Sequence, residues 1–341
     1  MLPCLVMCAG HGTRLDPLTR LVAKAAVPLA GPTLVERVLA GLRAHGVADV
    51  VINLHHRPES ITAVVGDGTH LGLRVRYSWE QPALGSAGGP RHALPLLDAD
   101  PFLIVNGDTL SDVDLDALVR THRSTGAEVT LAVVPNPAPH HYNGLVLDAD
   151  GRVTGGRPRG QAEGTWHFIG VQVAGRGVFA TLPDGVPAET IHGIYRDLLV
   201  ARPGAIRAVP VETAFRDVGT PRDYLDAAIA LAGETDAGHR TGAGRGIDPG
   251  PGPGGLLVAG EVAASARVER TVVWAGARVG DRVSLEDSVV AGAVTVPTGL
   301  SRRDVVIVPA RVCRDDDAAE VIGEAAVFPM PPGAGTPREL R

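Results

Sequence analysis

The stretch Met7-Cys8-Ala9-Gly10-His11-Gly12-Thr13-Arg14-Leu15 follows an apolar run at residues 2–8. A glycine-rich turn directly after a predicted strand is a common phosphate site in α/β proteins. A dinucleotide-binding turn would have a third glycine at position 15, and a P-loop would have Gly-Lys-Ser or Gly-Lys-Thr, so the spacing excludes both. What remains is a turn whose backbone N–H groups can approach a triphosphate, with Arg14 beside it and Lys24 ten residues later. On its own, the turn is equally compatible with an ordinary strand-to-loop connection.

Strand and helix patterns alternate on either side of this turn. Apolar runs predict strands at residues 2–8, 50–54, 73–78, 101–105, 128–134, 144–148, 166–173 and 206–211. Helical patterns occupy residues 34–44, the stretch after Pro58, and residues 118–125 and 224–231. Thr220 as N-cap, Pro221 at the first helical position and Asp223 in the first turn open the last helix. The alternation predicts a Rossmann-like three-layer α/β domain over residues 1–232.

The remaining third of the chain has a different pattern. Residues 233–255 are rich in Gly and Pro with almost no apolar pattern, which predicts a flexible linker. Over residues 256–312, apolar residues recur at steps near six, at Val262, Val268, Trp274, Val279, Leu285, Val290 and Val296. This period predicts a short left-handed parallel β-helix of hexapeptide repeats, with a small β-sandwich as the alternative. Residues 313–341 are Pro-rich and predict a tail or a loosely docked segment.

Composition narrows the class of protein. The chain has 341 residues, of which 45% are hydrophobic and 21% charged, as in globular proteins. A net charge of −6 argues against a broad electrostatic grip on nucleic acid or on an anionic membrane. Cys4, Cys8 and Cys313 are too few and too scattered for a disulfide framework or a four-ligand zinc site. Because there is no signal-peptide pattern and no apolar run of about 18 residues, we expect a cytoplasmic protein without nucleic-acid or membrane partners.

Several residues around the opening turn form a recognisable motif. Residues 9–15 (AGHGTRL) are followed by Pro17-Leu18-Thr19, by Lys24 and by Val27-Pro28. Together they resemble the opening motif of the sugar-1-phosphate nucleotidylyltransferases, the nucleotide-sugar pyrophosphorylases. The resemblance implies that the turn binds a nucleoside triphosphate, that Arg14 holds the departing phosphates and that Lys24 holds the reacting end. The family's usual Pro-Lys-Pro is Ala23-Lys24-Ala25 here, so the lysine is kept without its rigid flanks.

Later blocks of the same family occur in the same order. Residues 53–59 (NLHHRPE), 66–68 (GDG) and 84–89 (LGSAGG) resemble them. In the family the loop that matches residues 85–89 contacts the base, mostly through backbone groups. The nucleotide-binding residues implied by the resemblance are Ala9, Gly10, His11, Gly12, Thr13, Glu80, Gln81, Gly85, Ser86, Ala87 and Gly88.

Two aspartates stand out near predicted strand ends. Asp108 follows Asn106-Gly107 at the end of an apolar strand, and Asp217 precedes Val218-Gly219-Thr220-Pro221. Considered singly, each is more typical of a turn or cap. Mg²⁺ prefers one or two carboxylates together with water and phosphate oxygens, which two converging aspartates would supply. In the resemblance, Asp108 and Asp217 match the two metal-binding aspartates, and Asp108 joins Arg14 and Lys24 as a catalytic residue.

The blocks that resemble the family's sugar-binding segments match it less completely. Tyr142-Asn143-Gly144 resembles a segment whose glycine N–H faces the sugar, and residues 166–171 (WHFIGV) resemble the adjoining strand. Many members carry Glu-Lys-Pro between these blocks, whereas this chain has Gly156-Arg157-Pro158, so the phosphate contact can be kept and the hydroxyl contact from glutamate is lost. The implied sugar-binding residues are Asn106, Gly107, Asn143, Gly144, Arg157 and Gly170.

The resemblance implies one reaction and leaves several alternatives open. A nucleoside triphosphate and a sugar 1-phosphate would give a nucleotide sugar and pyrophosphate with Mg²⁺, and GTP with mannose 1-phosphate is the preferred pair. UTP with N-acetylmuramate 1-phosphate, another sugar 1-phosphate, or a cytidylyltransferase acting on a non-sugar phosphate or phosphonate are alternatives. A non-catalytic nucleotide-sugar sensor or regulatory subunit is a further one. A homo-oligomer is expected, assembled through the β-helix.

Overall fold

The computed structural model describes residues 1–238 and 257–331. The chain divides into two compact units. The first, here called the sheet unit, comprises Met1–His11 and Val35–Asp217. The second, here called the stack unit, comprises Gly12–Leu34 and Val218–Arg341. The predicted phosphate-binding turn is therefore divided, because His11 belongs to one unit and Gly12 to the other.

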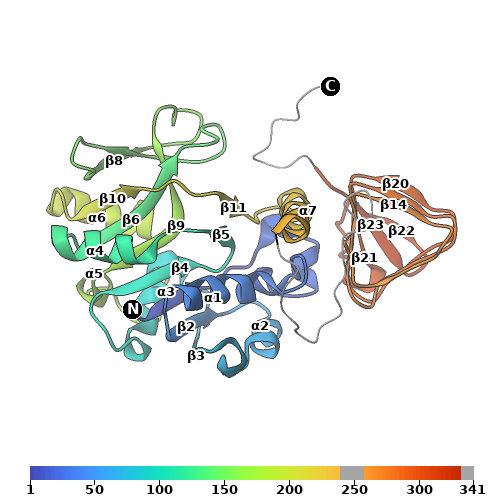
Figure 1. Cartoon of the computed structure of the whole chain (residues 1–341), viewed down its shortest axis with the longest axis horizontal. Helices are drawn as coiled ribbons and strands as arrows, with labels where there is room; N and C mark the ends of the chain where they lie inside the picture. The colour runs from blue at the N-terminus through green and yellow to red at the C-terminus, as the bar shows by residue number, and fades with distance from the viewer. Residues whose placement is uncertain (239–256, 332–341) are drawn as a thin grey trace. The chain divides into compact units, whose positions relative to one another are not determined.

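The sheet unit contains a nine-stranded mixed sheet (Figure 1). Its main path runs β10-β6-β9-β4-β1-β2-β3, and β7 and β8 extend it beside β9. Strands β4, β1, β2 and β3 are parallel to one another, as are β10 and β6, whereas β9 is antiparallel to both β4 and β6. The strands are β1 (Cys4–Met7), β2 (Asp49–Leu54), β3 (Arg74–Trp79), β4 (Phe102–Asn106), β6 (Val129–Pro135), β7 (Gly144–Leu147), β8 (Val153–Arg157), β9 (Trp166–Ala174) and β10 (Ile206–Pro210).

Helices cover both faces of this sheet. Successive side chains of a strand point to opposite faces, so Leu131 and Thr130 of β6 mark the two sides. Leu131 belongs to the core cluster that includes Ala87, Phe179 and Leu198 from three helices. On the other face, Thr130 Oγ1 is 2.9 Å from Nδ1 of the buried His122. The helices are α1 (Leu34–Ala44), α2 (Pro58–Val65), α3 (Gly85–Ala93), α4 (Leu115–Thr125), α5 (Arg176–Ala180) and α6 (Tyr195–Ala201). The predicted α/β class is confirmed.

Two predicted boundaries in the sheet unit differ from the structure. Residues 85–89 are the first turn of α3 and not a loop, because the carbonyl of Ala188 and the Glu80 carboxylate accept the hydrogen bonds of the N–H groups there. Helix α4 begins at Leu115, three residues before the predicted start, because Asp114 caps it by accepting a hydrogen bond from Ala117 N.

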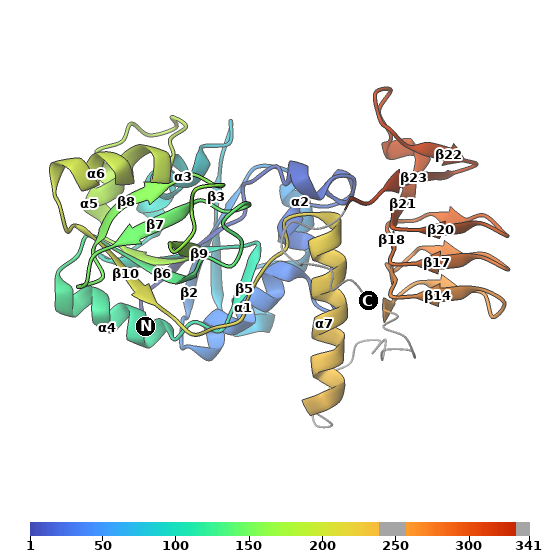
Figure 2. The ribbon, with the colours of Figure 1, turned by 90° about the horizontal axis from the view of Figure 1, so that it is seen from above.

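The stack unit contains three parallel sheets of short strands (Figure 2). Paired residues are mostly 17 positions apart, as in Glu261 with Arg278 and Arg278 with Thr295. This arrangement is compatible with the predicted β-helix. The strands are β12 (Leu257–Val258), β13 (Glu261–Val262), β14 (Arg267–Glu269), β15 (Val272–Val273), β16 (Arg278–Val279), β17 (Ser284–Glu286), β18 (Val289–Val290), β19 (Thr295–Val296), β20 (Ser301–Arg303) and β21 (Val305–Pro309).

The 17-residue period explains the irregular steps of the sequence pattern. Val268, Val273 and Val279 all belong to the interior cluster, so one of the steps is five residues long. Trp274, which the six-residue pattern included, is not part of this cluster, and its Nε1 donates to Tyr224 Oη at 2.8 Å.

Past the stack, the chain forms a hairpin where a tail was predicted. Strand β22 (Glu320–Ile322) pairs with β23 (Ala325–Pro329), which lies antiparallel to β21. Ala325, Ala326 and Val327 are buried. The apolar run therefore covers the free edge of β21, which would otherwise present unpaired backbone groups. Residues 332–341 of the predicted tail lie outside the described residues.

Helix α7 (Pro221–Gly238) precedes the stack. Its predicted cap is confirmed, because Thr220 N and Oγ1 donate to Asp223 Oδ2 while Asp223 N donates to Thr220 Oγ1. The helix continues six residues past Ala232, so the predicted linker begins as helix, and residues 239–256 lie outside the described part. Among helices of the described residues, none combines the length and apolar character needed to cross a membrane.

Candidate functional site

Asp108 lies where strand β4 ends beside strand β1. Gly107 N donates to Met7 O at 3.0 Å, and a side chain at Gly107 would overlap Cys8 Sγ. Only glycine therefore lets the chain pass this close to β1 before Asp108. Burial, with a smaller contribution from the Asp108 charge, raises the pKa of the Cys8 thiol, so Cys8 is an inert buried thiol.

A two-stranded sheet brings the second aspartate to the first. Strand β5 (Thr109–Ser111) pairs antiparallel with β11 (Phe215–Asp217), and Asp217 stands opposite Thr109, the residue after Asp108. Thr109 Oγ1 also donates to Asp108 Oδ1 at 3.3 Å. Asp217, more than a hundred positions along the chain, therefore pairs with the residue that directly follows Asp108. Carboxylate oxygens are the protein ligands that Mg²⁺ prefers, so this donor set fits the predicted metal.

A cleft of about 920 Å³ in the sheet unit contains three of the six predicted sugar-binding residues. It is lined by Asn143, Gly144 and Arg157, and by Ser86 from the predicted base-contacting stretch. Gly144 is required at this position because a side chain there would overlap Thr165. Asn143 Oδ1 accepts a hydrogen bond from the backbone N–H of Arg159 at 2.9 Å, which fixes its amide at the cleft wall.

Asn106 and Gly170 lie against each other. Gly170 has φ +78°, and a Cβ at this position would come within 2.6 Å of Asn106 Nδ2. The strand that carries Gly170, β9, pairs with β4, which ends at Asn106. Neither residue lines the cleft, so the six predicted sugar-side residues fall into two groups.

An aromatic cluster that the sequence analysis missed lies beside the cleft. The rings of Tyr142 and His167 are 4.2 Å apart between centroids, and Phe215 is 5.3 Å from His167. Burial lowers the pKa of His167 to about 4, so the imidazole is neutral at pH 7 and packs as an aromatic ring. Phe215 is two residues before Asp217 in β11, which connects the cluster to the carboxylate ladder. Tyr142 and His167 lie in the two blocks, residues 142–144 and 166–171, that resemble the family's sugar side, whereas no pattern in the sequence pointed to Phe215.

Gly85 and Gly88 allow the chain to pack closely against residues 186–190. Ala87 N donates to Ala188 O at 2.9 Å, and a side chain at Gly88 would come within 2.6 Å of Val186 O. Ser86 Oγ donates to Glu189 Oε2 at 2.6 Å. The N–H groups of Ala87 and Gly88, which the resemblance assigned to the base, therefore already have a partner within the chain.

Glu80 links two of the predicted nucleotide-binding segments. Its side chain is 5% exposed, and its two oxygens accept hydrogen bonds from Asn53 Nδ2 and Leu84 N, both at 2.7 Å. Asn53 Oδ1 in turn accepts from Cys8 N at 2.6 Å. This chain of hydrogen bonds fixes the end of β1, where Ala9 and Gly10 follow, relative to the start of α3. We found no comparable contact for Gln81 among the described residues.

The histidine of the opening turn lies among other histidines. The ring centroid of His11 is 4.9 Å from that of His55 and 5.7 Å from that of His56. His55 Nδ1 is within hydrogen-bond distance of Glu80 O, at 3.0 Å. His11 is therefore held in the sheet unit by the segment after β2.

In the stack unit, Gly12 and Lys24 lie together. Gly12 has φ +63°, and a Cβ at this position would be 3.0 Å from Lys24 Cβ and 2.9 Å from Thr19 Cγ2. Thr13 and Arg14 continue from it in the 3₁₀ turn η1 (Thr13–Leu15), and Lys24 begins the turn η3 (Lys24–Ala26). The predicted arrangement of a glycine turn next to the lysine is therefore present in this unit.

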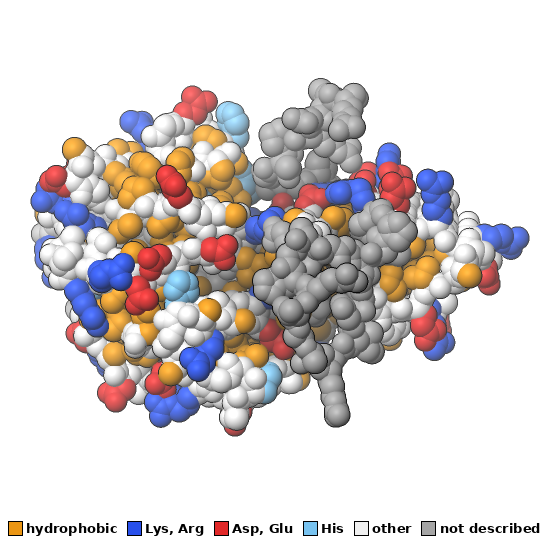
Figure 3. All heavy atoms as spheres, in the orientation of Figure 1, with side chains coloured by type: hydrophobic (Ala, Val, Ile, Leu, Met, Phe, Trp, Pro, Cys, Tyr) orange, Lys and Arg blue, Asp and Glu red, His pale blue; other side chains and the backbone are white. Residues whose placement is uncertain are grey.

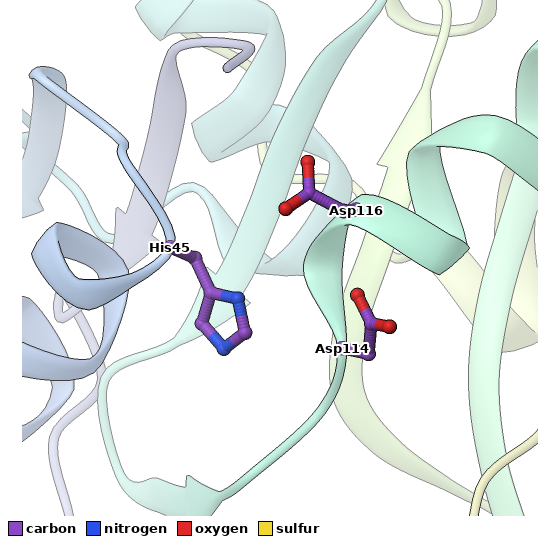
Figure 4. Close-up of side chains that lie close together, drawn as sticks. All are labelled: His45, Asp114 and Asp116. Atoms are coloured by element: carbon purple, nitrogen blue, oxygen red, sulfur yellow. The ribbon is translucent and has the colours of Figure 1, made fainter.

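A second group of potential ligands lies elsewhere in the sheet unit. The ligand atoms of His45, Asp114 and Asp116 lie within 4.8 Å of one another, and His45 faces the two carboxylates (Figure 4). Asp114 already caps α4 and lies 3.9 Å from Arg120, and both aspartates are exposed. On the face of the molecule that Figure 3 shows, charged side chains of both signs are interspersed, so exposed carboxylates are common there. Helix capping accounts for the position of Asp114.

Comparison with known proteins identifies the class to which this architecture belongs. The sequence model of the family described as nucleotidyl transferase matches residues 4–234. The chain belongs to the nucleotidyl transferase family. The match covers the sheet unit, the glycine turn with Lys24, and most of α7.

Individual relatives carry sugar-phosphate activities in their names. A mannose-1-phosphate guanylyltransferase of Mycobacterium tuberculosis is 29% identical over 313 residues, covering 86% of this chain and 81% of the relative. An N-acetylmuramate alpha-1-phosphate uridylyltransferase of Neisseria meningitidis is 39% identical over 144 residues, covering 41% of this chain and 62% of the relative. The family match makes the chain a nucleotidyltransferase, and these relatives are named for transfer to sugar 1-phosphates.

Solved structures confirm the fold. The crystal structure of HddC from Yersinia pseudotuberculosis complexed with GMP-PN superposes with a TM-score of 0.59 at 21% identity. The superposition covers 68% of this chain and all of that chain. At this identity the likeness concerns the fold alone.

Proposed function

We propose that this protein transfers a nucleotidyl group from a nucleoside triphosphate to a sugar 1-phosphate and releases pyrophosphate. The observation that carries the proposal is the pairing of β5 with β11, which sets Asp217 opposite Thr109 and so next to Asp108. A protein that merely sensed nucleotide sugars would not need both carboxylates. The same reasoning makes a non-catalytic regulatory subunit the weaker alternative.

Asp108 and Asp217 would hold Mg²⁺ between them and the phosphates. When bound, the ion would neutralise charge on the phosphate oxygens. The acceptor phosphate is already an anion, so its oxygen can attack the α-phosphorus without a general base. The residues of the chain then act by alignment and charge: Arg14 holds the departing β- and γ-phosphates, and Lys24 holds the α-phosphate.

GTP and mannose 1-phosphate are the first substrate pair to test. The support comes from the Mycobacterium tuberculosis relative, because the similarity to it extends over 86% of this chain and therefore includes both units. We also propose that the three parallel sheets form a left-handed β-helix and that the chain assembles as a homo-oligomer through it. Size-exclusion chromatography with light scattering checks the assembly, and a monomer would contradict it.

The cleft favours a second candidate acceptor. Among the described residues that line it are Arg157, Arg159 and Arg196, whereas Glu189 is the acidic one and accepts a hydrogen bond from Ser86. A sugar phosphate that carries a further carboxylate suits two or three guanidinium groups better than a neutral sugar does. N-acetylmuramate 1-phosphate, with its lactyl carboxylate, is such an acceptor, and UTP would be its donor.

A matrix of substrates tests these proposals. Pyrophosphate release is measured in Mg²⁺ with GTP, UTP and CTP, each combined with mannose 1-phosphate, N-acetylmuramate 1-phosphate and a non-sugar phosphonate. Release with GTP and mannose 1-phosphate supports the first pair, and release with UTP and N-acetylmuramate 1-phosphate supports the second. Release with CTP and the phosphonate alone would contradict a sugar acceptor. Silence across all combinations and across further hexose 1-phosphates, with nucleotide sugar still bound, would contradict transfer.

A further inference from the structure

The segment that contains Arg14 and Lys24 belongs to the same compact unit as the C-terminal strands. The segment Gly12–Leu34, here called the phosphate segment, belongs to the stack unit together with α7 and the parallel strands. It consists of three short 3₁₀ turns, η1, η2 (Leu18–Arg20) and η3, joined by irregular chain. Turns this short have little stability of their own, so the position of Lys24 depends on contacts made outside the segment.

Arg20 provides the first of these contacts. Its side chain is 8% exposed, and its guanidinium donates to Asp16 Oδ1 at 2.8 Å and to Asp317 Oδ1 at 2.7 Å. It also donates to Val312 O at 3.1 Å and lies 5.2 Å from the ring centroid of Phe328 in β23. The hydrogen bonds from Arg20 lower the pKa of Asp317 to about 2, so the pair is ionised at neutral pH. Arg20 thus attaches the phosphate segment to the C-terminal hairpin and the turn before it.

Two further contacts lie on either side of Lys24. A Cβ at Gly292 would be 3.1 Å from Leu21 Cδ1, so Leu21 packs directly on the corner between β18 and β19. After Lys24, Pro28 O accepts a hydrogen bond of 2.6 Å from Tyr224 Oη, and Tyr224 Oη accepts one of 2.8 Å from Trp274 Nε1. Tyr224 is fully buried. Lys24 therefore lies between two points that are both tied to the stacked strands.

We propose that the stacked strands and their terminal hairpin position the triphosphate-binding segment, with Asp317 and Trp274 as positioning residues for Lys24. The proposal rests on the proposed function, because it takes the triphosphate as the ligand of Gly12 and Lys24. It gives the C-terminal strands a role in transfer itself, in addition to any role in assembly. Small displacements of a group that aligns phosphates cost catalytic rate, because alignment is most of what the protein contributes.

Asp317→Asn tests this role, since it removes the charge and keeps the shape. The matched control is Asp316→Asn, which changes an exposed neighbour in the same turn. We expect Asp317→Asn to lower kcat or raise the KM for the triphosphate about tenfold, with the KM for the sugar phosphate unchanged. The control should match the wild type, and Asp317→Glu should recover part of the lost activity because it restores the charge.

Hydrogen exchange provides a readout that does not need turnover. In Asp317→Asn, amides of residues 13–28 should exchange faster than in the wild type, whereas amides of β1 and β2 should not change. If no substrate pair reacts even in the wild type, the proposed function fails while this exchange difference still tests the attachment. If Asp317→Asn does not fold, Trp274→Phe, which removes one N–H group, is measured in the same way. Wild-type kinetics together with unchanged exchange at residues 13–28 would overturn the proposal.

Discussion

Two charged clusters, one in each unit, are built in opposite ways. In the sheet unit, Asp108 and Asp217 have the same sign and are brought to adjacent positions by the short β5–β11 ladder. In the stack unit, Arg20 lies between Asp16 and Asp317, so the charges neutralise one another in a largely buried place. Neighbouring carboxylates favour a cation between them, whereas a neutralised cluster holds chain segments together. The first arrangement is suited to binding a ligand and the second to positioning.

The largest expected effect comes from the cluster of like charges. Asp108→Ala should lower kcat/KM for nucleotidyl transfer about 10³-fold, because it removes one of the two carboxylates proposed to hold Mg²⁺. The variant should remain folded, so that the lost rate reflects the site and not the fold. Pyrophosphate release and a thermal melt measure the two effects. Near-normal turnover of Asp108→Ala in Mg²⁺ would contradict the proposal that Asp108 holds the metal.

A substitution in the neutralised cluster should also lower stability. Arg20→Met leaves the Asp317 carboxylate, itself 10% exposed, without its guanidinium partner, and should cost about 3 kcal/mol of unfolding free energy. The matched control Arg120→Met breaks an exposed pair with Asp114 and should change stability by less than about 1 kcal/mol. Urea denaturation measures both. Equal unfolding free energies of the two variants would show that burial of the Arg20 cluster does not contribute to stability.

A smaller effect is expected within the cleft. Gly144→Ala would place a Cβ on the Thr165 side chain and should cost about 1–3 kcal/mol of stability, with a raised KM for the sugar phosphate. Gly155→Ala in the neighbouring strand β8 is the control, because a Cβ there meets nothing within 4 Å. Denaturation and initial-rate kinetics on both variants check the difference. A tolerated Gly144→Ala would mean that Thr165 moves aside at little cost.

The smallest expected effect is on the stability of the folded protein at low pH. The pKa of Asp317 is lowered from 3.8 to about 2 in the folded protein by the hydrogen bonds from Arg20, so the unfolded chain binds its proton first. The stability contributed by this carboxylate is present above pH 3.8 and is lost as the pH falls through 2. Between pH 5 and pH 2, the melting temperature should therefore fall more steeply in the wild type than in Asp317→Asn. If the melting temperatures of the wild type and Asp317→Asn fell equally with pH, the lowered pKa of Asp317 would be contradicted.

The sequence predicted the elements that have strong periodic patterns. Strand β4 (FLIVN) and helix α1 were found because their apolar residues repeat over several positions. Strands β5 (TLS) and β11 (FRD) were missed, since three residues of mixed polarity carry no period and their pairing is a tertiary contact. The five-residue step at Val273 was missed for a similar reason, because a six-residue period favours Trp274.

The site could be predicted as a set of residues more easily than as a geometry. The motifs pointed to Gly12, Lys24 and Asp108, but no sequence pattern relates Gly12 to the C-terminal hairpin. That relation depends on Arg20 reaching Asp317, 297 positions away. The glycines of residues 85–89 were recognised as a motif, whereas their packing against residues 186–190 depends on backbone contacts that sequence does not encode locally.

The measurement that tests the central claim most directly is pyrophosphate release as a function of Mg²⁺ concentration in wild type, Asp217→Asn and Asp112→Asn. Asp112 is exposed and follows β5 at the end of the ladder away from Asp108, so it serves as the control. We predict that Asp217→Asn needs about tenfold more Mg²⁺ for half-maximal rate and that Asp112→Asn matches the wild type. If Asp217→Asn kept the wild-type Mg²⁺ dependence, the β5–β11 ladder would not be a metal site and the account would be wrong.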